Sequence, residues 1–470
     1  MNLFRIKPVI DEGEKSGLRK VLGPIDLTLM GIGCIVGAGI FVLTGQAAAL
    51  HAGPAIVLSF VAAGIACAFA ALSYAELAST IGGCGSAYGY GYATLGEIVG
   101  WIIGWDLILE YGFGVSTVAV GWAGYVDNAL TAMGIHIPVA LTSAPGASPG
   151  GVINVLAILI VAIVTVLLCL GTKIGARFNG VMVGIKLAVL LIFIAVAIFY
   201  IKPELWHPFI PARGVNALGH PAYGWAGIMT GAATIFFAYI GFDSVSTAAE
   251  ETRNPQRNVP IGILASLVIC TLLYIVVSGL LTGIVPYSDL NTASPVSDAL
   301  IRIGLKGMAG ITAIGAIAGL TTVILVLFFG LTRIFLAMSR DGLLPPIFSA
   351  VNKKTGTPVR IIVISGVLMA VVAGLTPIDK LANLVNIGTL AAFTVVCAGV
   401  IWLRYKRPDM HRPFKTPFSP LFPALGVVCC LALMAFLPGI TWMVFLVWLI
   451  IGLFLYSFYG YRNSMLAKAK

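Results

Sequence analysis

The chain has 470 residues, of which 59% are hydrophobic and only 10% are charged, and its formal net charge is +10 at pH 7. A soluble domain carries roughly 25% charged residues, so this composition excludes an ordinary water-soluble protein and indicates an integral membrane protein. The basic excess does not indicate nucleic-acid binding. The lysines and arginines lie in short loops between apolar segments, where such residues set membrane topology.

The N-terminal residues 1–20 read as a short polar tail, because they mix acids and bases and lack the apolar centre of a cleaved signal peptide. After this tail, apolar segments recur that are long enough to cross a bilayer as helices, which takes about 20 residues each. We predict twelve of them, at 25–49, 54–79, 97–122, 152–171, 178–201, 224–249, 260–284, 309–332, 361–377, 383–403, 421–437 and 440–460.

The distribution of lysine and arginine predicts how these spans are oriented. With the N-terminus inside, cytoplasmic segments hold 22 of the 28 basic residues, external loops hold 5, and Lys186 alone lies within a span. This asymmetry predicts cytoplasmic N- and C-termini. No soluble domain of useful size interrupts the spans, so one membrane domain accounts for residues 1–470.

The first span contains the run GIGCIVGAGIFVLTG at residues 31–45. Glycine weakens a helix, so the backbone around Gly37 and Gly39 can unwind at the middle of the membrane. Exposed N–H and C=O groups are tolerated there only where they line a cavity or meet a ligand. The alternative is close packing of these glycines against a neighbouring helix.

Three ionisable residues lie deep in the third and fifth spans. Charged groups are costly inside a bilayer, so each of them indicates a functional or pairing role. Asp106 and Glu110 are four residues apart and share one face of a helix. Lys186 lies about eight residues into its span. A proton-coupling role for Lys186, with Glu110 as its partner, is favoured over a static ion pair between helices.

The sixth span carries a second interruption, FFAYIGFDS at residues 236–244, with Gly241 and Asp243 near its centre. Paired interruptions in corresponding positions of two halves indicate a transporter binding site. Half-helix N-termini attract a carboxylate and half-helix C-termini attract an ammonium, so a zwitterionic α-amino acid matches both. Asp243 either caps the second half of this helix or handles protons, and the aromatic residues either pack or close over a ligand.

These features together resemble the amino acid–polyamine–organocation superfamily, and within it the cationic amino acid transporter branch. The resemblance covers nearly the whole chain in order, through GAGIF (37–41), SYAEL (73–77), LILEYG (107–112), FFAYIGFD (236–243), EETRNPQRNVP (250–260), AMSRDGLLP (337–345), TPVR (357–360) and RPFKTP (412–417). It implies an all-α integral membrane protein with a five-plus-five inverted repeat. The two repeats would be residues 25–201 and 224–403, with two further helices at 421–460.

The resemblance also implies a substrate site made of backbone. Amides after the first break would hold the carboxylate of an amino acid, at Ala38, Gly39 and Ile40. Carbonyls near the breaks would hold its amine, at Ile35, Phe237, Ala238 and Ile240. Lys186 matches the fifth-helix lysine of proton-coupled relatives, which favours the proton as coupling ion, with no cofactor and no metal. We therefore include Lys186, Glu110 and Asp243 in the proton-coupling machinery.

The substrate side chain is left open between small neutral and cationic amino acids. The sequence displays no clear acidic pocket for a long basic side chain, and Thr321 and Thr322 are expected to line the pocket from the eighth span. The leading hypothesis is a proton-coupled symporter working by alternating access in a bacterial inner membrane. The alternative is an exchanger of amino acids or polyamines on the same fold. A small membrane-protein partner is left open.

Other classes of protein are disfavoured by what the sequence lacks. The five histidines lie in loops or at span edges, and there is no HExxH, no GxSxG elbow on a water-accessible face and no GxxxxGK[ST] loop. These absences argue against a membrane enzyme and an ATP-driven pump. The eight cysteines contain no CxxC pair, so neither a zinc site nor a disulfide framework is indicated. A nutrient sensor on a transporter fold is a further alternative. Such a protein would bind its ligand without transporting it.

Overall fold

The computed structural model describes the chain except for residues 1–3, 8–21, 82–85, 171, 250–251, 353–356 and 469–470. The predicted polar tail therefore lies outside the described residues, apart from residues 4–7. Helices dominate the described residues. The two strands found among them, β1 (Gly214–Val215) and β2 (Pro221–Ala222), pair as an antiparallel hairpin between helices.

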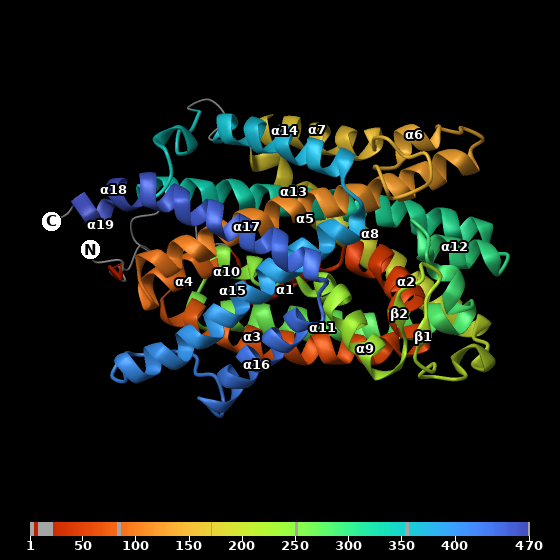
Figure 1. Ribbon diagram of the computed structural model, residues 1–470, viewed down its shortest axis with the longest axis horizontal. Coiled ribbons are helices and arrows are strands. Elements are labelled where there is room, and N and C mark those ends of the chain that lie inside the picture. Colours follow the sequence, from red (N-terminus) through yellow and green to blue (C-terminus); the bar gives the residue numbers. More distant parts are fainter. Residues whose placement is uncertain are drawn as a thin grey trace.

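Each apolar segment predicted from the sequence contains helix. The longer helices run side by side along the longest axis of the molecule (Figure 1). Their bounds are α1 (Pro24–Ile35), α3 (Ile56–Thr80), α5 (Glu97–Ala132), α7 (Val155–Leu170), α8 (Thr172–Ala197), α9 (Gly224–Ile235), α11 (Pro255–Ile284), α13 (Lys306–Arg340), α14 (Val359–Leu375), α15 (Ile378–Lys406), α16 (Leu421–Ala435) and α17 (Gly439–Leu455).

Shorter helices cap the bundle or complete interrupted spans. The α-helical ones are α2 (Thr44–Ala47), α4 (Ser86–Thr94), α6 (Val139–Thr142), α10 (Ser244–Thr247), α12 (Pro295–Arg302), α18 (Tyr461–Asn463) and α19 (Met465–Lys468). The π-helical turns are Gly39–Leu43, Ala48–Ala52 and Tyr456–Gly460. The 3-10 turns are Gly53–Ala55, Ile198–Tyr200, Pro203–Trp206, Phe236–Tyr239, Tyr287–Leu290 and Pro346–Phe348.

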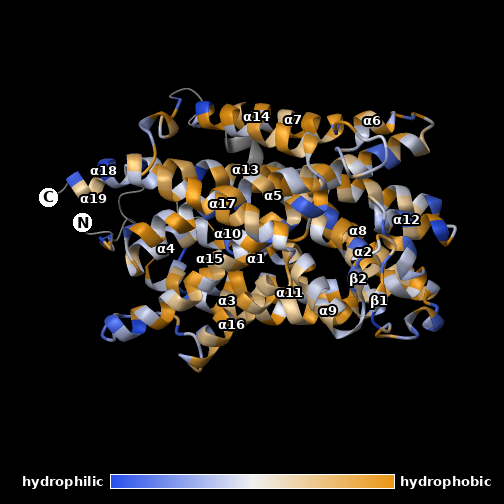
Figure 2. Cartoon of the chain, in the orientation of Figure 1, coloured by the Kyte–Doolittle hydropathy of each residue, from blue (hydrophilic) through white to orange (hydrophobic). Residues whose placement is uncertain are grey.

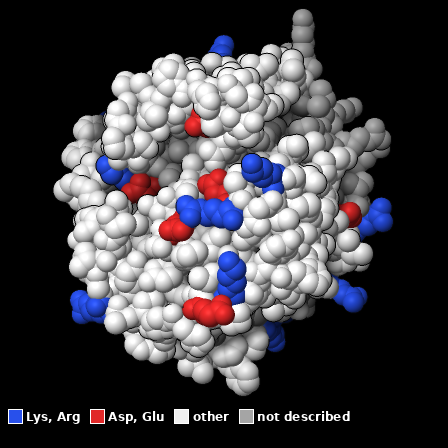
Figure 3. All heavy atoms as spheres, turned by 90° about the vertical axis from the view of Figure 1, so that its right-hand side faces the viewer, with Lys and Arg blue, Asp and Glu red and all other residues white. Residues whose placement is uncertain are grey.

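The helices have the length and composition of a membrane domain. Within the described residues, eight helical segments are long and apolar enough to cross a membrane, and four further apolar helices are shorter. Hydrophobic residues cover the middle of the bundle, whereas hydrophilic residues gather toward its two ends (Figure 2). Seen from the end opposite the termini, charged side chains of both signs are scattered over a mostly uncharged face (Figure 3). This is the distribution that a bilayer around the middle of the bundle requires.

The long helix α5 lies at the centre of the packing, because α13, α15 and α7 all pack along it. Around this centre, α11 packs along α3 and α1, and α16 packs along α15. The pair α7 and α14 forms an outer arm, seen along the upper edge of Figure 1. Both termini lie at one end of the bundle, which we call the terminal end (Figure 1).

A buried carboxylate fixes the loop that follows α15. Glu76 in α3 is fully buried and accepts two hydrogen bonds from Arg404, at 2.9 and 2.6 Å. Its Oε2 also accepts the backbone N–H of Thr416 at 2.8 Å, and Arg412 Nε lies 3.5 Å from its Oε1. One carboxylate therefore holds the end of α15 and the chain that leads to α16.

A second buried carboxylate joins both ends of the chain to α5. The side chain of Glu97 accepts hydrogen bonds from the hydroxyls of Tyr92 (3.1 Å), Tyr456 (2.8 Å) and Ser464 (2.6 Å). Arg5 approaches the same carboxylate at 3.7 Å and lies over the ring of Tyr461. The Glu97 carboxylate of α5 thus binds side chains from both the N-terminal segment and the C-terminal helices.

Removing the charge of Glu76 should destabilise the protein. We expect Glu76→Gln to lower the free energy of unfolding by about 3 kcal/mol, because it leaves two arginines beside an uncharged buried group. The matched control is Asp289→Asn, which breaks the exposed pair between Asp289 and Arg302 and should cost less than about 1 kcal/mol. Denaturant unfolding of the purified variants measures both values. Equal losses of stability would contradict a structural role for the buried Glu76 carboxylate.

Candidate functional site

The first long apolar segment is interrupted near its middle. Helix α1 ends at Ile35, and Val36 has an extended backbone, with φ −74° and ψ 97°. Helical structure resumes with the π-helical turn Gly39–Leu43, followed by α2. All residues from 31 to 45 are buried, so the carbonyls at the end of α1 and the amides that open the next turn lie inside the protein.

The sixth apolar segment is interrupted at a matching place. Helix α9 ends at Ile235, continues as a 3-10 turn to Tyr239, and then becomes extended at Ile240. Gly241 has φ +125°, which side-chain-bearing residues rarely adopt, so a glycine is required there. Helix α10 begins three residues later, at Ser244.

The two interruptions lie directly against each other. A Cβ atom added to Gly39 would lie 2.3 Å from the Cα of Ala238, and one added to Gly241 would lie 2.8 Å from the Sγ of Cys34. Both distances are too short for real Cβ contacts, so only glycine permits this approach. The glycines of residues 31–45 therefore serve close packing as well as unwinding.

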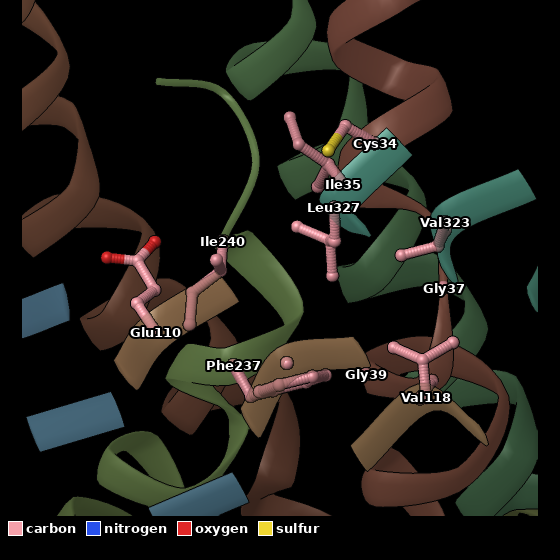
Figure 4. A pocket seen from close by; sticks show the side chains of 12 residues that line it. Cys34, Ile35, Gly37, Gly39, Glu110, Val118, Phe237, Ile240, Val323 and Leu327 are labelled. Carbon is pink, nitrogen blue, oxygen red and sulfur yellow. The ribbon is translucent and has the colours of Figure 1, made fainter. Parts of the chain in front are cut away.

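A cavity of about 320 Å³, including its open mouth, lies between the two interruptions, α5 and α13 (Figure 4). Its lining residues are Cys34, Ile35, Gly37, Ala38, Gly39, Glu110, Gly114, Val118, Phe237, Ile240, Val323 and Leu327. In the view of Figure 4, Glu110 lies at one edge and the aliphatic side chains of Val118, Val323 and Leu327 lie across from it.

Five of the seven residues predicted to bind substrate through their backbone line this cavity, namely Ile35, Ala38, Gly39, Phe237 and Ile240. The other two, Ile40 and Ala238, are not among the lining residues. Ile40 is fully buried, and Ala238 is the residue against which Gly39 packs. The predicted break residue Gly37 also lines the cavity, close to Val323.

A tyrosine that the sequence analysis missed connects the two interruptions. The hydroxyl of Tyr274 in α11 lies 2.8 Å from the carbonyl oxygen of Ile35 and 2.8 Å from that of Ala238. One hydroxyl hydrogen is shared between two carbonyls, and each carbonyl has a second lone pair. These oxygens therefore keep acceptor capacity for a cationic group.

Lys186 in α8 reaches the first interruption from the side. Its ammonium donates hydrogen bonds to the carbonyls of Gly33 and Val36, the second at 2.9 Å, and the side chain is fully buried. A Cβ on Gly319 would lie 3.1 Å from this side chain, so glycine makes room for it. The expected ion pair with Glu110 is not formed, because the carbonyls freed at the end of α1 take the ammonium instead.

The deep acids occupy three separate positions. Glu110 lines the cavity. Asp106 lies one turn along α5 and is buried, and its Oδ1 has no hydrogen-bond partner among the residues that the structure describes. Asp243 precedes α10 without making a capping hydrogen bond, and instead its Oδ2 accepts the hydroxyl of Tyr111 at 3.1 Å.

One expectation about neighbouring side chains needs correction. Thr321 and Thr322 do not line the cavity, because their hydroxyls donate to Ile317 and Gly319 within α13, and Trp122 donates to Thr321 at 3.0 Å. Val323 and Leu327 take that place.

Among the aromatic residues of the second interruption, only Phe237 lines the cavity. Tyr239 donates to the carbonyl of Phe60, whereas Phe236 and Phe242 pack against Phe393.

Comparison with known proteins agrees with this architecture. Residues 22–456 match the family described as amino acid permease. The chain is 46% identical to the methylthioribose transporter of Bacillus subtilis over 99% of the chain and 100% of that protein. It is 49% identical to the branched-chain amino acid permease BcaP of the same organism, over 99% of both chains.

More distant relatives are longer proteins from plants and animals. The vacuolar cationic amino acid transporter 4 of Arabidopsis thaliana is 39% identical over 83% of this chain and 64% of its own length. The fold and site define a membrane permease. The chain belongs to the amino acid permease family of the amino acid–polyamine–organocation superfamily.

Proposed function

We propose that the protein is a proton-coupled symporter of neutral α-amino acids with aliphatic side chains. The observation that carries this proposal is the contact between two interrupted helices beside one apolar-walled cavity. The interruptions offer N–H groups without a partner in their own turn and carbonyls that keep a second lone pair. Amino acid permease is a coarser description of the same function, and the relatives named above carry different substrates in their names.

The backbone around the cavity is suited to both ends of a zwitterion. The first amides of a helical turn have no partner within the turn, which leaves those of Ala38, Gly39 and Ile40 available for a carboxylate. The carbonyls of Ile35 and Ala238 both lie 2.8 Å from the hydroxyl of Tyr274, and each keeps a lone pair for an ammonium. These are the groups that the sequence analysis assigned to the substrate.

The cavity wall favours an aliphatic substrate side chain. Val118, Val323 and Leu327 present only hydrocarbon, and Glu110 is the one charged side chain among the lining residues. A long basic side chain would need a deeper polar channel than these residues provide. The name of the relative BcaP, a branched-chain amino acid permease, supports the same substrate class.

The substrate class can be tested with a panel of twenty amino acids, methylthioribose and putrescine. A ligand that binds only the folded protein raises its melting temperature. We expect leucine, isoleucine, valine and alanine to stabilise the purified protein and to be taken up by proteoliposomes. Stabilisation and uptake limited to arginine and lysine, or to methylthioribose, would contradict the proposal.

Lys186 is proposed to couple transport to protons. Its ammonium holds the end of α1 through two carbonyls, so loss of its proton would release that segment and connect protonation to the shape of the cavity. Glu110 and Asp243 lie in or near the cavity as candidate proton acceptors. The alternative of exchange between two amino acids predicts counterflow without proton-driven accumulation.

We further propose twelve spans, with residues 25–201 and 224–403 forming two inverted five-helix repeats and 421–460 forming two added helices. Eight long and four shorter apolar helices among the described residues support this count. The proposed location is the inner membrane of a bacterium, with the terminal end in the cytoplasm. The 22 basic residues assigned to that side support the orientation.

Loss of the Tyr274 hydroxyl should weaken substrate binding. Without it, the carbonyls of Ile35 and Ala238 lose the donor that holds the two interruptions together, and we expect Tyr274→Phe to raise the KM for uptake about tenfold. The control is Tyr239→Phe, whose hydroxyl bonds Phe60 and neither of these carbonyls. If both variants changed KM equally, the hydroxyl bridge would have no special role.

Shortening the cavity wall should shift selectivity. Leu327→Ala removes hydrocarbon from the lining, and we expect it to raise kcat/KM for phenylalanine relative to alanine about tenfold. Leu325→Ala changes a buried leucine of the same helix that lies outside the lining and controls for loss of stability. An unchanged ratio in Leu327→Ala would place the substrate side chain elsewhere.

A further inference from the structure

One buried carboxyl of α5 has no role in the site described above. Asp106 is 2% exposed, and its Oδ1 has no hydrogen-bond partner among the residues that the structure describes. The ion pairs found among those residues use other carboxylates, namely those of Glu76, Glu97, Asp289 and Asp341. A carboxyl without a partner is costly inside a membrane domain, and acids retained there commonly belong to proton pathways.

A glycine of α15 makes room for this carboxyl. A Cβ atom added to Gly388 would lie 2.9 Å from the Oδ1 of Asp106 and 3.3 Å from the Cδ2 of Leu109. The first distance is shorter than real Cβ contacts, so a side chain at position 388 would displace the carboxyl. Gly388 therefore lets Asp106 occupy the face of α5 that meets α15.

Asp106 lies one helical turn from Glu110, which is at the edge of the cavity between the interrupted helices (Figure 4). Residues four apart on a helix have Cβ atoms about 5–6 Å apart, so two carboxyls at this spacing can exchange a proton directly or through one water molecule. Helix α5 begins at the terminal end, where Glu97 accepts hydrogen bonds from Tyr456 and Ser464. Asp106 is therefore the acid of the pair nearer the terminal end, roughly 14 Å along the helix from Glu97.

A second unpartnered oxygen lies close to the same pair of acids. Tyr111, the residue that follows Glu110, donates to the Oδ2 of Asp243 at 3.1 Å. The Oδ1 of Asp243 is buried without a hydrogen-bond partner among the described residues, as is that of Asp106. Buried polar atoms of this kind need an explanation such as a bound water or a role in chemistry, and proton transfer uses both.

The charged side chains of the helices around α5 lie at helix ends or have other contacts. Helices α7 and α17 carry no acidic or basic side chain, and the basic residues of α14 and α15 lie within three residues of a helix end. The deepest basic residue of α13 is Arg333, whose guanidinium lies over the ring of Phe329. Helix α4 adds three tyrosines, of which Tyr88 and Tyr92 donate to other acids and Tyr90 is buried.

We propose that Asp106 is a proton relay residue between Glu110 and the cytoplasm. In this step the O–H bond of the protonated Glu110 carboxyl breaks, and its proton forms a new O–H bond on the carboxylate of Asp106. The proton then leaves Asp106 toward the terminal end. This inference rests on the proton-coupled symport proposed above, and it assigns the inward release of the proton to a residue that does not line the cavity.

The test follows protons and leucine separately in proteoliposomes of the full-length protein. A pH-sensitive dye trapped inside reports proton entry, and labelled leucine reports uptake. Asp106→Asn keeps the size of the side chain but cannot pass a proton, so it should reduce leucine-driven proton entry and gradient-driven accumulation about tenfold. Leucine-induced stabilisation and leucine counterflow should stay within about twofold of the original protein, because neither requires net release of a proton.

Two further variants separate a relay from a general disturbance of α5. Asp127→Asn is the matched control, because Asp127 lies on the same helix toward its opposite end and its Oδ1 also has no partner among the described residues. It should leave proton entry unchanged. Asp106→Glu restores an exchangeable proton and should bring proton entry back to within about threefold of the original protein.

The outcomes distinguish this inference from the function on which it rests. If the original protein takes up leucine without proton entry, the coupling proposal fails and the relay fails with it. If the original protein is proton-coupled, three results overturn the relay alone. These are unchanged proton entry in Asp106→Asn, loss of leucine-induced stabilisation in that variant, and an equal loss of proton entry in Asp127→Asn.

Discussion

Gly39→Ala is expected to reduce amino acid uptake by tenfold or more. The added methyl group would lie 2.3 Å from both the Cα and the Cβ of Ala238, so the two interrupted segments must move apart. Overpacking of this kind costs about 1–3 kcal/mol, and here the distortion falls on the backbone that surrounds the cavity. Gly39 also supplies one of the amides proposed to hold the carboxylate.

Initial uptake rates in proteoliposomes measure this effect, together with melting temperatures of the purified variants. The matched control is Gly184→Ala, because Gly184 is an exposed helical glycine with nothing within 4 Å of the added Cβ. We expect that control to transport normally. Normal uptake by Gly39→Ala would mean that the close approach of the two interruptions is not needed for transport.

Lys186→Met is expected to abolish accumulation driven by a proton gradient. Methionine fills the space beside Gly319 with an unbranched side chain but cannot donate to the carbonyls of Gly33 and Val36 or exchange a proton. Counterflow between amino acids should persist at a reduced rate, because the substrate groups of the cavity remain. Lys186→Arg keeps the charge but holds its proton permanently, so it should fail in the same way.

The measurement compares uptake into proteoliposomes with and without an inward proton gradient, and with a protonophore. In the original protein, uptake should rise with the gradient and collapse with the protonophore. Concentrative uptake that survives in Lys186→Met, or uptake that depends on sodium alone, would contradict proton coupling through this residue.

The sequence predicted the helical segments and the positions of both interruptions because these depend on local composition. Runs of hydrophobic residues indicate helices in a bilayer, and glycines such as Gly39 and Gly241 mark where a helix can break. Once the two breaks are located, the residues just before and after each break are the ones whose backbone can reach the cavity. Five of the seven predicted backbone positions therefore lie at its surface.

The sequence could not predict which faces of the other helices turn toward the cavity. In an apolar helix, successive residues differ by about 100° in direction, and hydrophobicity does not distinguish the faces. Thr321 and Thr322 were expected at the cavity, whereas Val323 lies there. Tyr274 contacts Ile35 across 239 residues of sequence, and Lys186 bonds carbonyls rather than Glu110. Such contacts depend on how the helices assemble.

Competition by leucine analogues tests the proposed two-ended binding most directly. Isoamylamine keeps the amine of leucine and lacks its carboxylate, whereas 4-methylpentanoate keeps the carboxylate and lacks the amine. If peptide groups of the two interrupted helices bind both charges, each analogue should inhibit leucine uptake at least about 100-fold more weakly than leucine itself, since hydrogen bonds to a charged group contribute about 1.5–3 kcal/mol each. An analogue that competes as well as leucine would show that one end of the substrate is not bound there.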